Sequence, residues 1–244
     1  MMPKTAMVLA AGLGKRMRGH ADGLPKPLLE VGGETLIDRA LDRLADAGVT
    51  TCVVNLHYRA DVVRGHLDKR VAAGKPPAVV YSDETDALLE TGGGLVRALP
   101  LLGSGAFFVA NGDVLWRDRG RNAFAHLARR WDDGRMDALL LLHPRETAIG
   151  MDGTGDYALN DDGSIVRAQD GAPAPYFFTG LRMMHPRLLA DAPRGAFSVL
   201  ELFDRAERAG RLHGLVHEGE WMHVGSPEGL AQAEAALAQT WTRA

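Results

Sequence analysis

The first 145 residues alternate between short apolar runs and longer segments in which apolar positions recur with a helical spacing. The apolar runs are typical of buried strands, and they occupy residues 6–10, 51–55, 78–81, 106–110 and 137–142. The intervening spacing predicts helices at residues 36–44, 61–71, 94–99 and 121–131. Strands that alternate with helices build a mostly parallel sheet. The pattern therefore predicts an α/β fold with a Rossmann-like, mostly parallel sheet flanked by helices.

Local signals mark the ends of several helices. Thr35 and Asp38 have the spacing of a capping box before the helix at residues 36–44. Pro100 is expected to end the short helix at residues 94–99, because proline lacks the N–H that a helix needs. Ser226 is expected to cap a last helix that has Pro227 at its first position.

The pattern changes after about residue 144. Two polar-apolar segments, residues 156–160 and 164–168, flank an Asp-Asp-Gly turn and predict a β-hairpin. The remaining elements expected here are strands at 175–184, 213–217 and 221–224, and a helix within 197–210 that has Ser198 and Glu201 at capping-box spacing. We expect one domain over residues 1–244, with one part at about 1–144 and a smaller C-terminal α+β lobe at about 145–244.

Composition excludes several classes of protein. The 28 basic and 31 acidic residues are mixed along the chain and give a net charge of −3, which argues against a general nucleic-acid binder. The single cysteine, Cys52, excludes an internal disulfide. The polar start is too short for a signal peptide, and no apolar run reaches the length of a membrane span. We expect a cytoplasmic protein that binds neither nucleic acid nor membrane, as a monomer or small homo-oligomer.

A loop rich in small and cationic residues follows the first predicted strand. Gly12 and Gly14 are followed by Lys15 and Arg16, and Lys26 then stands between two prolines. Small residues let backbone N–H groups approach an anion closely, and the cations neutralise its charge. The prolines restrict the backbone around Lys26 and so fix its direction. The segment predicts a phosphate site at the carboxyl end of a strand; the alternative is an ordinary strand–loop–helix turn.

The loop differs from the two common phosphate-binding motifs. A dinucleotide-binding fingerprint would have a third glycine in place of Met17 and an acidic residue in place of Asn55. A Walker loop would end in Gly-Lys-Ser or Gly-Lys-Thr, which this loop does not contain. An NAD-dependent oxidoreductase, suggested only by the two glycines, is therefore disfavoured.

Two further segments follow predicted strands. Asn111, Gly112 and Asp113 come after residues 106–110, where a carboxylate can hold a divalent cation against phosphates; the alternative is a strand-ending turn. Three successive glycines at residues 92–94 are costly in chain entropy. They are expected where the backbone must touch a flat ligand, and the alternative is a flexible turn.

Together, the segment Leu-Ala-Ala-Gly-Leu-Gly-Lys-Arg-Met-Arg at residues 9–18 and the segment Pro-Lys-Pro-Leu at residues 25–28 resemble the signature of the sugar-phosphate nucleotidyltransferases, the enzymes that make NDP-sugars. The resemblance extends over about residues 6–237 and implies a nucleotide-binding first part and a sugar-binding lobe. It implies an in-line attack by a sugar 1-phosphate on the α-phosphorus of an NTP, with pyrophosphate released. It also implies Mg²⁺ as cofactor, with Mn²⁺ as the alternative.

The resemblance also implies roles for individual residues. Arg16 and Lys26 would act on the phosphates, Asp113 would hold the metal, and Glu84 would read the edge of the base. The other nucleotide-binding positions would be Leu9, Ala10, Ala11, Gly12, Gly14, Lys15, Thr91, Gly92, Gly93 and Asn111. The sugar pocket would contain Gly155, Asp156, Thr179, Gly180 and, at a helix N-terminus, Ser198.

One position departs from the family pattern. Many members carry a second metal-binding aspartate in Trp-x-Asp-x-Gly-Thr, where this chain has His223. His223 could ligate a softer metal than Mg²⁺, or the second site could be degraded and the activity low. We favour a third interpretation, in which His223 bonds a phosphate while Asp113, phosphates and water hold the Mg²⁺.

The substrates implied by the resemblance remain a set of alternatives. The spelling Glu-Thr-Gly-Gly-Gly at residues 90–94 resembles the branch that joins UTP to N-acetylmuramate α-1-phosphate, which serves peptidoglycan recycling. GTP with mannose 1-phosphate, and dTTP or UTP with glucose 1-phosphate, are the alternatives within the family. A nucleotide- or NDP-sugar-binding protein with weak catalysis is an alternative of another class, motivated by His223.

Overall fold

The computed structural model describes residues 2–14, 23–169 and 171–239. The strands are β1 (Thr5–Leu9), β2 (Glu30–Val31), β3 (Glu34–Thr35), β4 (Thr51–Leu56), β5 (Ala78–Asp83), β6 (Phe107–Asn111), β7 (Val114–Arg117), β8 (Ala138–Pro144), β9 (Tyr157–Leu159), β10 (Ile165–Arg167), β11 (Tyr176–Met184), β12 (Leu212–Val216) and β13 (Glu220–His223). The α-helices are α1 (Leu36–Asp46), α2 (Ala60–Ala72), α3 (Glu90–Leu102), α4 (Ala123–Arg130), α5 (Leu200–Arg208) and α6 (Pro227–Ala238), and the 3₁₀ turns are η2 (Lys26–Leu28), η3 (Arg145–Thr147) and η4 (Pro186–Leu189).

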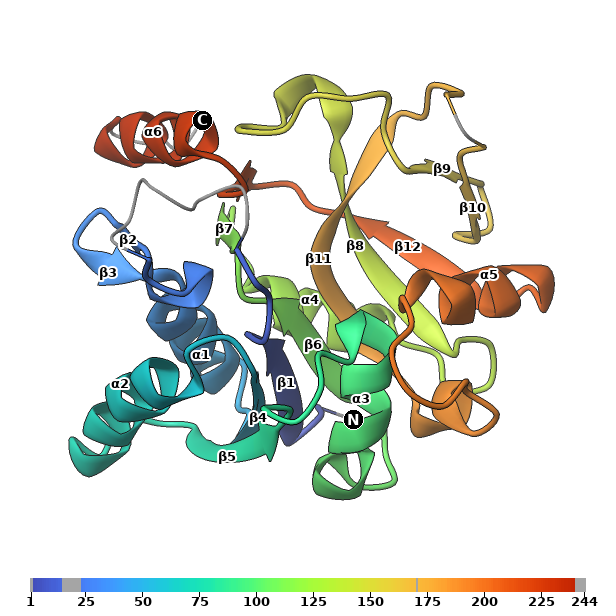
Figure 1. Ribbon diagram of the computed structural model, residues 1–244. Coiled ribbons are helices and arrows are strands. Elements are labelled where there is room, and N and C mark those ends of the chain that lie inside the picture. The colour runs from blue at the N-terminus through green and yellow to red at the C-terminus, as the bar shows by residue number, and fades with distance from the viewer. Residues whose placement is uncertain (1, 15–22, 170, 240–244) are drawn as a thin grey trace.

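The central sheet joins strands from both parts of the chain (Figure 1). Strands β5, β4, β1 and β6 lie side by side and run parallel. Strand β11 then pairs antiparallel with both β6 and β8, and β12 runs parallel to β8. The β9–β10 hairpin adds to the start of β11. The predicted α/β fold with a mostly parallel sheet is confirmed, and the predicted hairpin after residue 144 is present.

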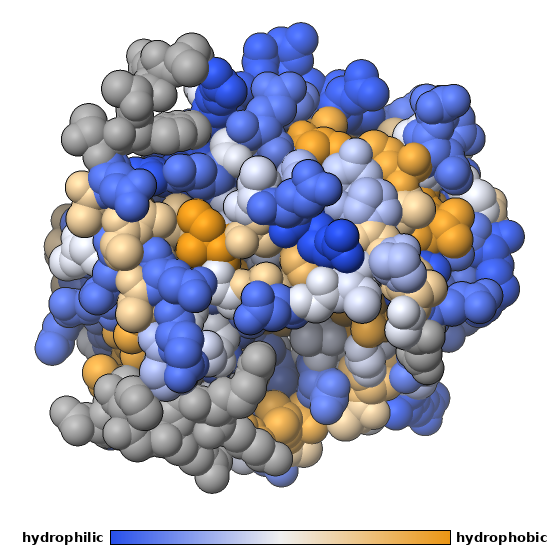
Figure 2. All heavy atoms as spheres, turned by 90° about the horizontal axis from the view of Figure 1, so that it is seen from above, coloured by the Kyte–Doolittle hydropathy of each residue, from blue (hydrophilic) through white to orange (hydrophobic). Residues whose placement is uncertain are grey.

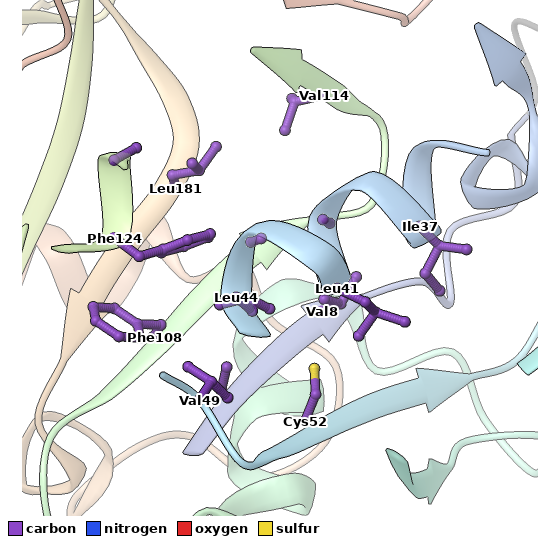
Figure 3. Packing of buried hydrophobic residues seen from close by; sticks show 14 of the residues in the cluster. Val8, Ile37, Leu41, Leu44, Val49, Cys52, Phe108, Val114, Phe124 and Leu181 are labelled. Atoms are coloured by element: carbon purple, nitrogen blue, oxygen red, sulfur yellow. The ribbon is translucent and has the colours of Figure 1, made fainter. Parts of the chain in front are cut away.

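Helices cover both faces of the sheet because successive strand residues point to opposite faces. One apolar cluster contains Val8, Cys52 and Phe108 from the strands, together with side chains of α1, α2 and α4 (Figure 3). The neighbouring strand residues, such as Met7 and Phe107, belong to a second cluster with α3 and α5. In Figure 1, α3 and α5 lie in front of the sheet and α4 lies behind it. This three-layer packing fixes where the strands end.

A small second sheet continues from the main one. Strand β7 pairs antiparallel with β13, with Val114 opposite His223. Helix α6 packs beside β2 and β13, where Val31, Met222 and Ala233 form part of a third apolar cluster. Strand β7, which the apolar pattern did not predict, carries the chain away from Asp113 and brings β13 alongside that residue.

The caps at the starts of two helices are as predicted. Thr35 Oγ1 accepts a hydrogen bond from the Asp38 N–H at 3.2 Å, and Ser226 Oγ accepts one from the Gly229 N–H at 3.2 Å. None of the described helices combines the length and the apolar character that a membrane span requires.

Two other predicted helix boundaries were wrong. Helix α3 begins at Glu90 and runs through Pro100 to Leu102, because burial of Leu95 and Leu102 against the sheet outweighs the bond that proline removes near the helix end. Helix α5 begins at Leu200 with Val199 at its cap position, and Ser198 Oγ accepts from the Leu200 N–H, not from the Glu201 N–H, so the predicted capping box is absent.

Candidate active site

A cleft of about 270 Å³ opens where β1, β4 and β6 end, the usual ligand site of an open α/β sheet. Its lining residues are Leu9, Ala10, Ala11, Gly12, Lys26, Pro27, Asn55, Leu88, Glu90, Thr91, Asn111, Gly112 and Asp113. The molecular face seen from above is largely hydrophilic, with hydrophobic residues in separate patches (Figure 2). Most lining residues of the cleft come from the end of β1, the Pro-Lys-Pro segment, the start of α3 and the turn after β6, so the cleft joins segments that were predicted separately from the sequence.

Lys26 and Asp113 form an ion pair in this cleft. Lys26 Nζ lies 3.3 Å from Asp113 Oδ2, and the two side chains are 12% and 29% exposed. Lys26 comes from the η2 turn, and Asp113 follows β6. A cation and a carboxylate this close, and this shielded from water, can bind the phosphates and the metal of a nucleotide at one place.

Gly112 holds Asp113 against the end of β1. Its N–H donates to the Leu9 carbonyl at 2.9 Å, and a Cβ built on Gly112 would lie 2.6 Å from that carbonyl oxygen and 3.2 Å from Pro27 Cγ. No larger residue fits there without displacing the backbone. The turn after β6 is therefore a tightly packed element, and Asp113 is placed by it.

The structure places Glu84 behind the cleft wall, not in it. Glu84 is fully buried, and its Oε1 accepts a hydrogen bond from Asn55 Nδ2 at 2.8 Å. Asn55 Oδ1 in turn accepts from the Ala10 N–H at 2.7 Å. Burial raises the pKa of Glu84 above the ordinary range of a carboxyl group. Glu84 thus orients Asn55, which lines the cleft in its place. Asn55, Pro27, Leu88, Glu90 and Gly112 are the lining residues that were not predicted as site residues.

The glycines at the start of α3 pack against protein. A Cβ on Gly92 would lie 2.3 Å from the Phe197 ring, and a Cβ on Gly93 would lie 2.2 Å from the Gly195 carbonyl oxygen. The Gly92 N–H also donates to the Phe197 carbonyl at 2.9 Å. Thr91 lines the cleft, whereas Gly92 and Gly93 do not. Close packing against the protein therefore explains Gly92 and Gly93, for which we expected contact with a flat ligand.

A second cavity of about 390 Å³ lies in the C-terminal part, and Gly155 and Asp156 line it together with Arg167 and Phe178. Asp156 Oδ2 accepts a hydrogen bond from the Phe178 N–H at 2.8 Å, and burial raises the pKa of Asp156. Gly155 has a φ of 87° and approaches the Ala174 carbonyl too closely for any side chain. These two residues lie together, as predicted, but outside the first cleft.

The other predicted sugar-side residues are engaged within the protein. Thr179 is buried, and its hydroxyl donates to the Leu141 carbonyl at 2.8 Å. Gly180 lies at a bulge in β11, where a Cβ would come within 2.9 Å of Asn111 Nδ2. Ser198 Oγ accepts from the Leu200 N–H at 3.3 Å. None of these three residues is among those that line the first cleft.

A buried arginine lies next to Asn111. Arg182 Nη1 donates to Asn111 Oδ1 at 3.0 Å and to the Gly180 carbonyl at 3.1 Å. Its Nε and Nη2 have no hydrogen-bond partner among the described residues. Burial lowers the pKa of Arg182 to about 9, so it stays charged at neutral pH. The sequence could have indicated Arg182 as a candidate site residue, because it is the lone cation in the predicted strand at residues 175–184.

His223 lies on the strand beside Asp113, but its ring does not line the cleft. A Cβ on Gly225 would be 2.1 Å from His223 Nε2, and the Trp221 ring centroid lies 6.2 Å from that of His223. The described residues contain no group of three or more His, Cys, Asp or Glu side chains placed to hold a metal. Mg²⁺ commonly takes one carboxylate and completes its shell with phosphates and water, so Asp113 fits such an ion.

The first loop is described only in part. Gly14 has a φ of 58°, and a Cβ there would lie 3.4 Å from Lys26 Cγ, so Gly14 lies against the lysine stem. Lys15 and Arg16 lie outside the described residues. Of the sequence-predicted residues, the cleft is lined by Leu9, Ala10, Ala11, Gly12, Lys26, Thr91, Asn111 and Asp113.

Comparison with known proteins finds a family match over residues 6–220, to the model described as "MobA-like NTP transferase domain". An N-acetylmuramate alpha-1-phosphate uridylyltransferase of Caulobacter vibrioides is 48% identical over 97% of this chain and 98% of its own. An enzyme of the same name from Neisseria meningitidis serogroup B is 35% identical over 97% and 99%. A solved UDP-glucose pyrophosphorylase complexed with UDP-glucose superimposes with a TM-score of 0.78 over 97% and 98%; at 15% identity this likeness supports the fold alone.

The packing role of Gly93 can be tested against another helical glycine. Gly93→Ala is expected to lower the free energy of unfolding by about 1–3 kcal/mol, because the new methyl group would collide with the Gly195 carbonyl oxygen. Gly65→Ala in α2 has open space around it and is expected to raise the same quantity by about 0.5–1 kcal/mol. Urea unfolding measures both, and equal effects of the two substitutions would contradict the packing role.

Proposed function

The chain belongs to the MobA-like NTP transferase domain family, and we propose that it transfers a uridylyl group from UTP to N-acetylmuramate α-1-phosphate. The products are UDP-N-acetylmuramate and pyrophosphate. The observation that carries this proposal is the 48% identity with the Caulobacter uridylyltransferase across almost the whole of both chains. The ion pair of Lys26 and Asp113 in a cleft at the sheet's carboxyl edge supports the same chemistry. We also infer a cytoplasmic location, where UTP is available.

The reaction needs charge neutralisation more than proton transfer. The phosphate oxygen of the sugar 1-phosphate is already ionised at neutral pH, so it can attack the α-phosphorus of UTP in line without a general base. Pyrophosphate leaves as the new P–O bond forms. Lys26 binds the phosphate oxygens, and Arg16 of the first loop takes the same role. The chain's contribution is therefore to place two anions against each other and offset their repulsion.

Asp113 is our candidate for the metal ligand. Bound Mg²⁺, or Mn²⁺ as the alternative, would supply additional positive charge at the phosphates. In the structure, the Asp113 carboxylate pairs with Lys26. Binding of nucleotide and metal would replace this ion pair by a contact of Lys26 with the phosphates and a contact of Asp113 with the metal. We keep His223 as the proposed phosphate partner. Its strand runs beside Asp113, with a 3.2 Å bond from the Val224 N–H to the Asp113 carbonyl, but its ring does not line the cleft and would have to turn toward the phosphates.

The order of the strands suggests how UTP lies. Lys26 and Asp113 are on the β6 side of β1, so the triphosphate belongs there. The nucleoside then extends toward β4 and the start of α3, past Ala11 and Gly12 and toward Asn55 and Thr91. Asn111, held by Arg182, lies between the cleft and the C-terminal part. We place the sugar on that side, with Gly155 and Asp156 in its pocket wall and Thr179, Gly180 and Ser198 as support.

A substrate matrix tests the proposal. Pyrophosphate release is measured with UTP, GTP and dTTP against N-acetylmuramate, mannose and glucose 1-phosphates, in Mg²⁺ and in Mn²⁺. We expect UTP with N-acetylmuramate α-1-phosphate to give the highest kcat/KM, by about tenfold or more over the other pairs. A higher value for GTP with mannose 1-phosphate would contradict the proposal. Nucleotide binding with no release in either metal would favour the weakly catalytic alternative.

Substitutions at the ion pair test the roles of its members. Lys26→Ala should lower kcat/KM about 30- to 1,000-fold, since loss of one preorganised charge at a reacting phosphate removes about 2–4 kcal/mol of transition-state stabilisation. Asp113→Ala should abolish detectable turnover while the circular dichroism spectrum stays that of the parent. Lys69→Ala, at an exposed position on α2, is the matched control and should leave kcat/KM unchanged. Parent-like rates in either test variant would remove that residue from the reaction centre.

A further inference from the structure

Glu90 has an unusual backbone conformation for its residue type. Its φ is 61°, and Arg59 is the only other non-glycine residue in the described part of the chain with a positive φ. The left-handed region is costly for residues that carry a Cβ, and glycine adopts it freely. A glutamate at this position therefore needs a reason beyond the path of the backbone.

The surrounding bonds hold the backbone in this conformation. On one side, the Leu89 carbonyl accepts from the Phe197 N–H at 3.3 Å. On the other side, Thr91 Oγ1 accepts from the Val199 N–H at 2.9 Å, and the Gly92 N–H donates to the Phe197 carbonyl. Strain of this kind persists where neighbouring contacts over-determine the backbone, and it is concentrated at ligand sites. The position would accept glycine with less strain, so the side chain is the feature to explain.

Glu90 lines the nucleotide cleft and is exposed there. Among the described residues, its carboxylate has no hydrogen bond or ion pair. Asn55, the polar neighbour on β4, uses its amide on Glu84 and on the Ala10 N–H. Thr91 already accepts from the Val199 N–H, which leaves its own O–H to donate. Among the described residues, Glu90 is thus a cleft-lining hydrogen-bond acceptor without a partner, at the start of α3, whereas Lys26 and Asp113 line the cleft from η2 and from the turn after β6.

We propose that the Glu90 carboxylate accepts a hydrogen bond from the nucleoside of UTP and thereby selects it. A carboxylate at neutral pH only accepts hydrogen bonds, and phosphates offer no donor and repel it. The donors that UTP presents at this end are N3–H of uracil and the ribose hydroxyls. CTP has a bare N3 lone pair, which would face the carboxylate unfavourably. This inference rests on the proposed function for the identity of the nucleotide, but it does not depend on the sugar.

The experiment measures nucleotide affinity with Mg²⁺ and without sugar phosphate, by calorimetry, for the parent, Glu90→Gln and Glu90→Gly. Glu90→Gly should weaken UTP binding about 10- to 100-fold, as expected for loss of a hydrogen bond to a charged group. It should also raise Tm by about 2–4 °C, because the left-handed strain is relieved. Opposite changes in affinity and stability separate a binding role from a structural one. Glu90→Gln should retain part of the affinity, since its amide oxygen still accepts.

Modified nucleotides identify the donor. If N3–H is the partner, CTP and N3-methyl-UTP should bind the parent as weakly as UTP binds Glu90→Gly, and 2′-deoxy-UTP should bind like UTP. If a ribose hydroxyl is the partner, 2′-deoxy- or 3′-deoxy-UTP should show that loss, and CTP should not. Glu201→Gln, at an exposed first-turn acid of α5, is the control for a general effect on a helix start and should leave affinity unchanged.

Two outcomes would overturn the inference. One is an unchanged UTP affinity in Glu90→Gly. The other is an equal loss in that variant for UTP, CTP and the deoxy nucleotides, which would indicate a distorted cleft. Neither result depends on the transfer reaction. If the parent binds UTP in a Glu90-dependent way yet transfers nothing to N-acetylmuramate α-1-phosphate, the proposed function fails and the Glu90 assignment stands.

Discussion

The 3.3 Å ion pair between Lys26 and Asp113 is the interaction on which the candidate site depends. Its members come from segments 87 positions apart, and two different constraints bring them together. Prolines on both sides of Lys26 restrict its backbone, and the contact of Gly112 with the end of β1 fixes Asp113. The pair holds a shielded positive and negative charge where three parallel strands end. A triphosphate with its metal presents the complementary charges. The phosphates can therefore take the place of Asp113 beside Lys26, and the metal can take the place of Lys26 beside Asp113.

Close backbone approach, more than flexibility, explains the glycines around this site. Gly112 lies against a carbonyl of β1, Gly93 against a carbonyl of the loop before α5, and Gly180 against the Asn111 amide. Each contact joins an element of the N-terminal part to a neighbour that is distant in sequence or belongs to the C-terminal part. The same packing that makes these positions intolerant of a side chain sets the walls of the cleft. Glu90 is the exception, because it keeps a side chain where glycine would be less strained.

The sequence predicted the fold class and much of the cleft because both depend on local patterns. Apolar runs revealed the buried parallel strands, and a residue just after a strand, such as Asp113, lies at the carboxyl edge of the sheet whatever the details of packing. Lys26, in the η2 turn, was instead indicated by the two prolines that flank it. The reach of α3 past Pro100 was missed, since tertiary burial overrode a local helix breaker. Strand β7 was missed because its pairing with β13 is long-range. Glu84 was predicted to face the nucleotide, but Asn55 faces the cleft and Glu84 supports it from behind. The residue types along the chain do not reveal which of the two side chains points into the cleft.

A crystal structure of the chain with UTP and Mg²⁺ tests the central claim most directly. The account predicts that the triphosphate lies between Lys26 and Asp113, that the two side chains separate beyond their present 3.3 Å, and that each contacts the ligand or its metal. A triphosphate bound elsewhere, or an ion pair that stays closed with UTP in place, would contradict it.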